Sequence, residues 1–418
     1  MKQLKKITLK EYETTLSGYL NAQDILEVEK LNNLSKTEIF EIKSNNRIRA
    51  KQYVGIVKIN NKNIQILPKI FGKEKNAILK NLLYMLSYTK KLKIRESDIA
   101  NLGKINDLFE VFIYIFSKEL LALLKKDYKK NYNIIEKNSS FLKGKLLFSK
   151  HLQQNLFNKS RFFIEYEKMD ENFLLNIFLK STCEKLIKIT QSKTNSKLLN
   201  RCNFILKDID SKDFVSPKIL DTIDFHRQNK AYEHIVSLGK MLYFGNSPDF
   251  SKNLENNFSL LFDMNVLFEE FIAEFMKKNK DALDPNIHHI SSQVANKYVF
   301  LNKKFTLKPD IFIHYNNNNI LIIDTKYKKL DASKTNNGVS SSDIYQMLAY
   351  GMRYFGSYDT QKQKNIILLY PDYDEKNYDT VYKSEENIHI KIKTLNMNVD
   401  LASISGKNKL IEEMKNIF

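Results

Sequence analysis

The sequence predicts an α+β multidomain protein with a β-rich amino-terminal module, a mainly helical middle region and a carboxyl-terminal α/β domain. Short apolar runs separated by Asn-rich turns fill residues 1–75, which is typical of strands. Apolar residues recur with a helical period through most of residues 76–249. Strand and helix patterns alternate in residues 250–418. A chain of 418 residues is expected to form two or three domains, and these three ranges are the expected divisions.

The amino-terminal module is expected to contain four strands. Tyr53–Ile59 and Ile64–Leu67 flank an Asn-rich turn, which predicts a hairpin. Pro68 ends this run, because proline has no N–H to donate to a sheet. Glu38–Ile42 and Ile48–Tyr53 are the other two expected strands. None of these strands carries a group of catalytic residue types.

The middle region is expected to be built mainly from helices. Its strongest helical period lies in Ile105–Lys126, whose continuous apolar face must be buried or form an interface. A break at Gly245–Pro248 precedes the third region. The remaining expected elements are a helix at Ala77–Tyr88, a strand entering a helix at Phe141–Leu156, a strand at Arg161–Tyr166, and helices at Asp170–Ile189 and Leu220–Gly245.

The segment Leu307–Tyr327 predicts a β-hairpin around the polar turn Asn316–Asn319. Asp310, Asp324 and Lys326 lie at the open end of this hairpin. Residues two apart on a strand face the same side, so Asp324 and Lys326 are expected to project together. Two carboxylates at one end of a sheet suit a hard cation such as Mg²⁺ or Mn²⁺. A neighbouring ammonium can orient water and stabilise negative charge on a phosphate.

The register of this hairpin decides whether the two carboxylates can meet. If Tyr315 paired with Ile320, Asp310 would lie opposite Thr325 and point away from Asp324. Binding of one metal by both carboxylates requires the same face. We therefore expect an odd-length loop, a β-bulge or a distorted strand start at Asp310.

Two predicted helices flank the hairpin in the sequence. The first carries a stripe of apolar residues within 260–275 and places Glu269 and Glu270 beside that stripe. The second begins near Ser342 or Asp343 and carries Gln346 and Tyr350, which are neighbours at i and i+4 on one face.

The composition favours a polyanionic partner. The net charge is +19, and Lys outnumbers Arg 60 to 7. Since base recognition relies on Arg, Asn and Gln, so few Arg residues favour contacts to the nucleic-acid backbone. Only Cys183 and Cys202 are present, so structural zinc or a disulfide framework is not expected, and a reducing cytoplasm fits. No apolar run approaches the roughly 18 residues of a membrane span, so no membrane association is expected.

The order of these motifs resembles that of a known nuclease superfamily. Pro309-Asp310 followed by Asp324-Thr325-Lys326 resembles the PD-(D/E)xK signature. A helix acid before it and Gln346 and Tyr350 after it resemble the RecB-like branch. The resemblance implies a carboxyl-terminal PD-(D/E)xK restriction-endonuclease-like domain.

Most of the chain resembles the McrC family, the nuclease subunit of McrBC-type restriction systems. The segments that carry this resemblance are Glu11-Tyr12, YVGIV with IQILPKI, the helix at Leu82–Tyr88, FLKGKLL, FDMNVLFEEFI, KPDIFI, IDTKYK and SSDIYQMLAY. It implies catalytic roles for Asp310, Asp324, Lys326 and Glu269, with the three acids as metal ligands. It also implies supporting roles for Gln346 and Tyr350.

The resemblance also implies partners. McrC proteins act with McrB, a hexameric AAA+ GTPase that recognises double-stranded DNA, and their amino-terminal half docks in the hexamer and stimulates GTP hydrolysis. This sequence contains no GxxxxGK[ST] motif, so GTP is expected to act only through the partner. Arg47 and Arg49 in the amino-terminal module are candidate GTPase contacts, although exposed arginines are often only solvated. Pairing of two complexes for double-strand cleavage is also expected.

Two other functions fit the same features. One is a stand-alone RecB-like DNA nuclease, which would not require about 250 residues ahead of the nuclease motifs. The other is a non-catalytic activator or scaffold of an AAA+ ring, which would not require Asp310, Asp324 and Lys326 together. If docking and catalysis occupy separate domains, deletion of residues 1–75 should abolish GTPase stimulation and leave the nuclease domain folded.

Overall fold

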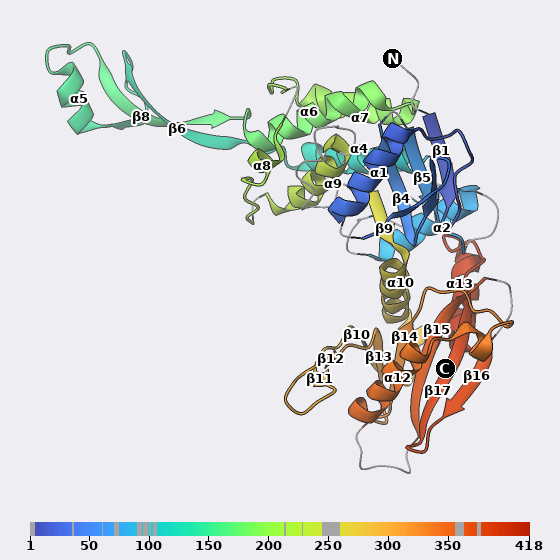
Figure 1. Ribbon diagram of the computed structural model, residues 1–418. Coiled ribbons are helices and arrows are strands. Elements are labelled where there is room, and N and C mark those ends of the chain that lie inside the picture. The colour runs from blue at the N-terminus through green and yellow to red at the C-terminus, as the bar shows by residue number, and fades with distance from the viewer. Residues whose placement is uncertain are drawn as a thin grey trace. The chain divides into compact units, whose positions relative to one another are not determined.

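The structure is a computed structural model (Figure 1). It describes the whole chain except residues 1–4, 36, 61, 71–74, 90–93, 95–98, 100–101, 103–106, 213–214, 228, 245–259, 356–362 and 374–377. The expected break at Gly245–Pro248 and the first residues of the helix expected from Ile105 lie outside the described residues. The chain divides into two compact units, one formed by residues 1–108 with 253–418 and the other by residues 109–252. The division at residues 75 and 249 stays a prediction.

The amino-terminal part of the first unit contains a four-stranded sheet in the order β1-β5-β4-β9 and a separate β2-β3 hairpin. The bounds are β1 Lys5–Lys10, α1 Ala22–Ser35, β2 Phe40–Lys43, β3 Arg47–Ala50, β4 Tyr53–Ile59, β5 Lys62–Leu67 and α2 Lys75–Tyr88. The four expected strands are confirmed with small shifts at their ends. Strand β1 and helix α1 were not expected from the sequence, and apolar residues of both pack in this small core.

Strand β9, Leu260–Asp263, joins this amino-terminal sheet although it lies about 200 residues later in the sequence. It pairs antiparallel with β4, with Tyr53 opposite Asp263. The expectation that the whole apolar stripe from residue 260 is helical is therefore wrong for these four residues. Helix α10, Met264–Lys278, begins only after Asp263, whose side chain accepts a hydrogen bond from Asn265 N and caps the helix.

The carboxyl-terminal part of the first unit is a six-stranded sheet in the order β10-β13-β14-β15-β17-β16. Strands β14, β15 and β17 run parallel, and the outer pairs are antiparallel. The bounds are α11 Lys280–Leu283, β10 Ile287–Ser292, β11 Lys297–Tyr298, β12 Thr306–Leu307, β13 Ile311–Tyr315, β14 Ile320–Thr325, α12 Ser341–Tyr354, β15 Lys364–Asp372, β16 Asp379–Lys383, β17 Ile388–Asn396 and α13 Ile404–Lys415.

The central strands of this sheet are almost continuously apolar, as expected for parallel strands that are covered on both faces. Helix α12 packs against β15 and β17, and α13 packs against β17. The N-cap of α12 is Ser340, whose hydroxyl accepts from Asp343 N, rather than the expected Ser342 or Asp343. Ser340, Ser342 and Asp343 all have side chains that can cap a helix, so the sequence pattern did not distinguish between them.

The second unit contains helices and a long arm built on a three-stranded sheet in the order β6-β8-β7. Its bounds are α4 Leu108–Lys126, β6 Asn131–Ser139, β7 Lys145–Leu146, α5 Phe148–Asn155, β8 Phe162–Asp170, α6 Leu174–Ile189, α7 Lys193–Ile205, α8 Pro217–Leu220 and α9 Glu233–Phe244. Strands β6 and β8 pair over nine residues each, and Figure 1 shows them leaving the helices of this unit, with α5 at the far end. We call residues 131–170 the arm.

The arm and α7 correct the expected secondary structure of the middle region. The strand–helix segment at Phe141–Leu156 is confirmed, but β6 was not predicted, because its polar sequence NYNIIEKNS lacks a strand-like apolar alternation. Helix α7 was not predicted either. It is capped by Ser192 and buries Asn195, which donates to Glu110, so tertiary contacts stabilise a polar segment.

The mixed α/β architecture with more than one unit is confirmed. Within the described part of the chain, every helix is too short or too polar to cross a bilayer.

Candidate active site

The turn of the β13–β14 hairpin determines which side chains face each other. Ile311 pairs with Ile323, and the five residues 315–319 form the turn. Because the turn has an odd length, the same register continued by one residue brings Asp310 opposite Asp324, and the Asp310 charge contributes to the raised pKa of Asp324. Residues directly opposite each other on antiparallel strands project to the same face. The predicted odd-length loop is therefore confirmed, and the two carboxylates share one face.

Asp310 is held by hydrogen bonds at the start of β13. Its Oδ2 accepts from Thr325 N at 2.7 Å and from Thr325 Oγ1 at 2.8 Å. Its main-chain oxygen accepts from Gln293 N at 3.0 Å. Burial raises the pKa of Asp310, while the Thr325 donors and the Lys326 ammonium partly offset that rise. The carboxylate thus has a fixed orientation.

Asp324 and Lys326 form a close ion pair on β14 and just after it. The Lys326 Nζ lies 2.5 Å from Asp324 Oδ2, and the Asp324 side chain is only 1% exposed. Burial, followed by the neighbouring Asp310 charge, raises the pKa of Asp324 to about 7. Burial acts to lower the pKa of Lys326, but the carboxylates around it raise it above its ordinary value. The expected projection of Asp324 and Lys326 to one face is confirmed, and the site carries more negative than positive charge.

Glu269 on α10 is the third acid of this group. Gln293 Nε2 donates a hydrogen bond to Glu269 Oε1. Burial, and then the charge of Asp310, raises the pKa of Glu269, which places its carboxyl beside Asp310. Glu269 is thus the better candidate than Glu270 for the helix acid. Gln293 had no sequence signal.

Gln346 and Tyr350 on α12 connect Lys326 to the strand that leads into Asp310. Lys326 Nζ donates to Gln346 Oε1 at 3.2 Å, and Gln346 Nε2 donates to Tyr350 OH at 2.7 Å. Tyr350 OH in turn donates to Lys308 O at 3.0 Å. Because this hydroxyl uses its proton on Lys308 O, it can only accept from the amide, which keeps Gln346 Oε1 turned toward Lys326. The expected i, i+4 pair is confirmed in geometry.

Asp343, one turn before Gln346 on α12, also belongs to the electrostatic surroundings of the site. It is buried, and its Oδ2 lies 3.0 Å from Lys328 Nζ. Its charge contributes to the raised pKa values of Lys326 and Asp324. From the sequence, Asp343 was expected only as a possible helix cap, although its i, i+3 spacing to Gln346 placed it on the same face.

Residues of the amino-terminal module support the end of the strand that carries Lys326. Tyr327 OH donates to Glu11 Oε2 at 2.6 Å, and Lys69 N donates to the same oxygen at 3.1 Å. Lys69 Nζ lies 4.1 Å from the ring centroid of Tyr12 and 5.5 Å from that of Tyr327, which are cation–π distances. Burial raises the pKa of Glu11 to about 7, although the Tyr327 hydroxyl and Lys69 oppose that rise.

Arg47 and Arg49 lie on β3, far along the chain from these carboxylates. Arg49 Nε donates to Tyr12 O at 3.0 Å, and Arg47 Nε donates to Ser44 O at 3.2 Å. Both guanidinium groups thus make contacts within the amino-terminal module. Their proposed contact with a GTPase stays a prediction.

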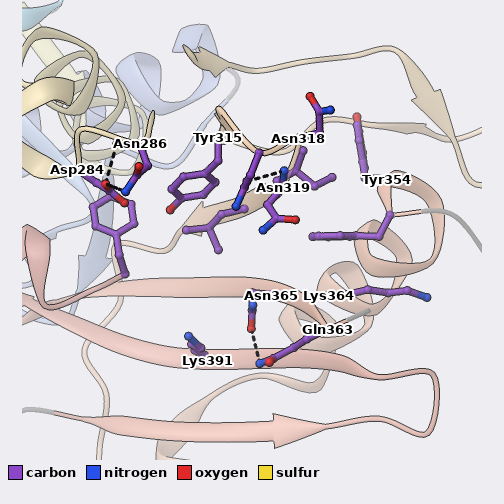
Figure 2. Close-up of a pocket in the computed structure, with 15 residues that line it drawn as sticks. Asp284, Asn286, Tyr315, Asn318, Asn319, Tyr354, Gln363, Lys364, Asn365 and Lys391 are labelled. Carbon is purple, nitrogen blue, oxygen red and sulfur yellow. Dashed lines mark hydrogen bonds between the residues drawn. The ribbon is translucent and has the colours of Figure 1, made fainter. Parts of the chain in front are cut away.

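A cavity of about 880 Å³ lies at the other end of the hairpin, around its Asn-rich turn. Figure 2 shows Tyr315, Asn318 and Asn319 on one side of this cavity and Asn365 and Lys391 on the other. It contains none of the carboxylates described above. The acidic group at the open end of the hairpin is therefore the candidate active site.

Comparisons with known proteins identify the family of this chain. The family model described as "McrBC 5-methylcytosine restriction system component" matches residues 48–371. The chain is 24% identical over 313 residues to the type IV methyl-directed restriction enzyme EcoKMcrBC of Escherichia coli K12, covering 71% of this chain and 86% of that protein.

Two solved structures share the fold. One is the refined half-complex from the tetradecameric assembly of Thermococcus gammatolerans McrB AAA+ hexamers with bound McrC. It matches with a TM-score of 0.76 and 22% identity, over 99% of this chain and 100% of the matched chain. The other is the McrBC complex of the same organism, with a TM-score of 0.53 and 24% identity, over 66% of this chain and 88% of the matched chain. The family match covers most of the sequence, and the chain therefore belongs to the family of McrBC 5-methylcytosine restriction system components.

Proposed function

We propose that this chain is the DNA endonuclease subunit of a GTP-dependent McrBC-type restriction system. It hydrolyses phosphodiester bonds with Mg²⁺ or Mn²⁺ and stimulates the GTPase of an AAA+ McrB partner. The observation that carries the proposal is the odd-length turn that sets Asp310 opposite Asp324, with Lys326 ion-paired beside them. This is the juxtaposition that the PD-(D/E)xK signature requires.

The donor set suits a small divalent cation. Asp310 and Asp324 supply hard carboxylate oxygens, and Asp324 Oδ1 is buried without a hydrogen-bond partner among the described residues. In the same part of the chain, no group of three or more His, Cys, Asp or Glu side chains is placed to hold a metal ion. We therefore assign Asp310 and Asp324 as the protein ligands, because Mg²⁺ commonly binds one or two carboxylates and takes water and phosphate oxygens as its other ligands.

Glu269 has two roles open to it, a further ligand or the acid that positions the attacking water. Its hydrogen bond from Gln293 and its place beside Asp310 favour the second role. When bound, the cation would withdraw charge from the scissile phosphate and offset the excess of negative charge in the site.

Lys326 is the cation that the protein itself supplies to the reaction. Asp324 and Gln346 hold its ammonium in one place, which allows it to stabilise the negative charge that develops on the phosphate oxygens. The oxygen of a water molecule forms a bond to phosphorus while the bond from phosphorus to the leaving oxygen breaks. The water gives up one proton, and the leaving oxygen gains one.

The arm is the surface that we assign to the AAA+ partner. A cluster of large apolar side chains is exposed on it, which is typical of a protein-interaction surface. These side chains are Tyr132, Ile134, Phe141, Leu142, Phe148, Leu152, Leu156, Phe157 and Met169. The matched Thermococcus structure contains McrC bound to McrB AAA+ hexamers, which supports a partner of that class. The arm is a stronger candidate than Arg47 and Arg49, whose guanidinium groups contact their own module.

Two alternatives are weaker. A stand-alone RecB-like nuclease would have no partner to cover the exposed apolar side chains of the arm. A non-catalytic scaffold would have no need for Asp310, Asp324 and Lys326 in ion-paired, hydrogen-bonded positions, since buried charges are costly to keep.

The test is plasmid cleavage and GTP hydrolysis by the chain reconstituted with its AAA+ partner in Mg²⁺. Lys326→Ala and Asp324→Asn should abolish cleavage and leave GTPase stimulation intact. Lys393→Ala is the matched control, because Lys393 is also ion-paired, at 2.6 Å to Asp379, and is 18% exposed compared with 20% for Lys326. Cleavage by a folded Lys326→Ala protein at the control's rate, or cleavage in excess chelator, would refute the nuclease assignment.

A further inference from the structure

A short hairpin leaves the six-stranded sheet directly beside the candidate active site. Gln293 N donates to Asp310 O at 3.0 Å, and the chain between these two residues forms a separate excursion that Figure 1 shows extending away from the sheet. Strands β11 and β12 pair within it, with Lys297 opposite Leu307. We call residues 294–309 the tip hairpin. One end of the tip hairpin follows Gln293, which contacts Glu269, and the other end leads directly into Asp310.

The end of the tip hairpin exposes large apolar side chains to water. Leu301 is 91% exposed, Phe305 73% and Phe300 54%. The Phe300 and Phe305 rings pack edge to face with their centroids 5.8 Å apart, and Val299 N donates to Phe305 O at 2.9 Å. These contacts hold the two rings together, and Leu301 follows Phe300 directly in the chain. Such an exposed cluster needs a partner to cover it.

The backbone of this segment is strained. Of the described residues other than Gly and Asn, four have a positive φ, and three of these are Gln293, Lys303 and Phe305, at 52°, 59° and 58°. For residues with a side chain this conformation costs on the order of 1 kcal/mol each. Strain that persists in one segment beside an active site is commonly connected with function.

The charge of the segment is positive only. Lys297, Lys303, Lys304 and Lys308 lie within it, and there is no Asp or Glu from Ser291 to Pro309. None of these four lysines has a carboxylate within ion-pairing distance in the part of the chain that the structure describes. The segment therefore offers ammonium groups on both sides of an apolar end. Phosphates flanking stacked bases are complementary to this arrangement, whereas a second copy of this chain, or another protein, would need to supply matching acids.

We propose that the tip hairpin contacts duplex DNA beside the scissile phosphate. Leu301, with Phe300 and Phe305, enters the minor groove as an apolar wedge between base pairs, and Lys303 and Lys304 contact the flanking phosphates. The inference rests on the proposed function, since it assumes that DNA occupies the carboxylate site. Eight residues from Gln293 to Leu301 reach at most about 26 Å, so the wedge acts within about eight base pairs of the cleaved bond.

The experiment uses the full chain and 24-base-pair duplexes that carry 2-aminopurine at successive positions, at low salt and in EDTA so that no cleavage occurs. Wild type should raise the fluorescence at one or two adjacent positions, because a wedge unstacks the reporter base. Leu301→Ser combined with Phe305→Ser should lose that rise. Ile404→Ser is the matched control, because Ile404 is 83% exposed on α13, and it should behave as wild type.

The lysines give an independent measurement. Lys303→Gln with Lys304→Gln should lower the slope of log affinity against log salt concentration by about 2, since each phosphate contact contributes about 0.9. Lys407→Gln with Lys409→Gln on α13 is the control and should leave the slope unchanged.

Three outcomes would overturn the inference. The first is that wild type raises the fluorescence at no position. The second is that the double serine variant raises it as much as wild type does. The third is that the double serine variant loses self-association in sedimentation but keeps its DNA contacts, which would make the tip hairpin an interface between two copies. Failure of the proposed function would look different. The complex would then not cleave plasmid in Mg²⁺, while the fluorescence rise in EDTA and its loss in the double serine variant would remain.

Discussion

At the scale of single residues, the candidate site depends on hydrogen bonds that fix the direction of each polar group. Thr325 orients Asp310 through two donors, and Gln346 accepts from Lys326 only because Tyr350 uses its own proton elsewhere. Each of these bonds removes a conformation that the reacting groups could otherwise adopt. Orientation of this kind is what a preorganised site contributes to catalysis.

Tyr350→Phe should lower the rate of DNA cleavage by about 10- to 100-fold, the usual range for loss of a residue that orients a metal site. Without the hydroxyl, Gln346 can rotate its amide and present an N–H to Lys326 instead of an oxygen. The measurement is the single-turnover cleavage rate of the complex. Tyr345→Phe is the control on the same helix, because the Tyr345 side chain is 69% exposed. Equal rates for the two variants would contradict the orienting role.

Glu11→Gln should stabilise the protein at pH 8 and change little at pH 5. The folded pKa of Glu11 is about 7, above its ordinary 4.5. The folded state therefore binds the proton more tightly, and this contribution is full below pH 4.5 and is lost as the pH rises through 7. The difference is worth on the order of 3 kcal/mol at pH 8.

The measurement is the free energy of unfolding in urea for wild type and Glu11→Gln at both pH values. Comparing the two proteins at each pH, and then the two pH values, cancels the contribution to unfolding of other groups that titrate in the same range. An equal difference at pH 5 and pH 8 would show that Glu11 is not held protonated by its surroundings.

At the scale of elements, helix α12 has to lie close to the sheet for Gln346 to reach Lys326. Gly351 permits this approach. A Cβ added there would lie 2.7 Å from Ile388 Cδ1 and 2.8 Å from its Cγ2, so the helix or β17 would have to move. The small residue therefore sets the distance between helix α12 and β17.

Gly351→Ala should destabilise the protein by about 1–3 kcal/mol, the usual cost of overpacking a core, and should lower cleavage more than stability alone explains. Gly239→Ala in α9 is the control. There the nearest atom to the added Cβ is Phe116 Cε2 at 3.1 Å, so the crowding is smaller. Both substitutions gain about 1 kcal/mol of helix propensity, which offsets the smaller crowding at Gly239 but not the larger crowding at Gly351. Urea unfolding and cleavage rates on both variants test this order. Greater loss with Gly239→Ala would contradict it.

At the scale of the whole molecule, the candidate active site and the arm proposed to bind the partner belong to different compact units. The candidate active site belongs to the unit of residues 1–108 and 253–418, and the apolar arm belongs to residues 109–252. The expectation that residues 1–75 can be removed without unfolding the nuclease domain no longer follows. Strand β9 pairs with β4, and Glu11 accepts from Tyr327, so the deletion would uncover both.

Leu142→Ser combined with Phe157→Ser in the arm should weaken binding to the AAA+ partner and reduce stimulation of its GTPase by at least about tenfold. Each exposed apolar side chain contributes on the order of 1–2 kcal/mol to the binding free energy when the partner covers it. Urea unfolding of the chain should not change. Phe204→Ser is the control, because Phe204 is 74% exposed on α7 outside the arm. GTPase rates measured across partner concentrations test this, and wild-type stimulation by the arm variant would remove the arm from the interface.

Much of the fold and most of the candidate site followed from the sequence. Short-range patterns predicted four strands of the amino-terminal module, most helices of the middle region and the hairpin at Leu307–Tyr327, because burial periodicity and turn residues act locally. The spacing of Asp324 and Lys326 placed both on one face, and the i, i+4 spacing joined Gln346 to Tyr350. These relations depend only on the geometry of a strand and a helix.

The tertiary structure decided what depends on partners distant in sequence. The length of the turn fixed Asp310 opposite Asp324, since four asparagines allow several registers and only packing of the apolar face selects one. Leu260–Asp263 became a strand because β4 offered an unpaired edge, although its apolar residues fit a helix equally well. Gln293 and Glu11 reached the site through folding of segments whose sequences carry no catalytic pattern. Local rules contain no information about such contacts, because they arise only when the sheets close.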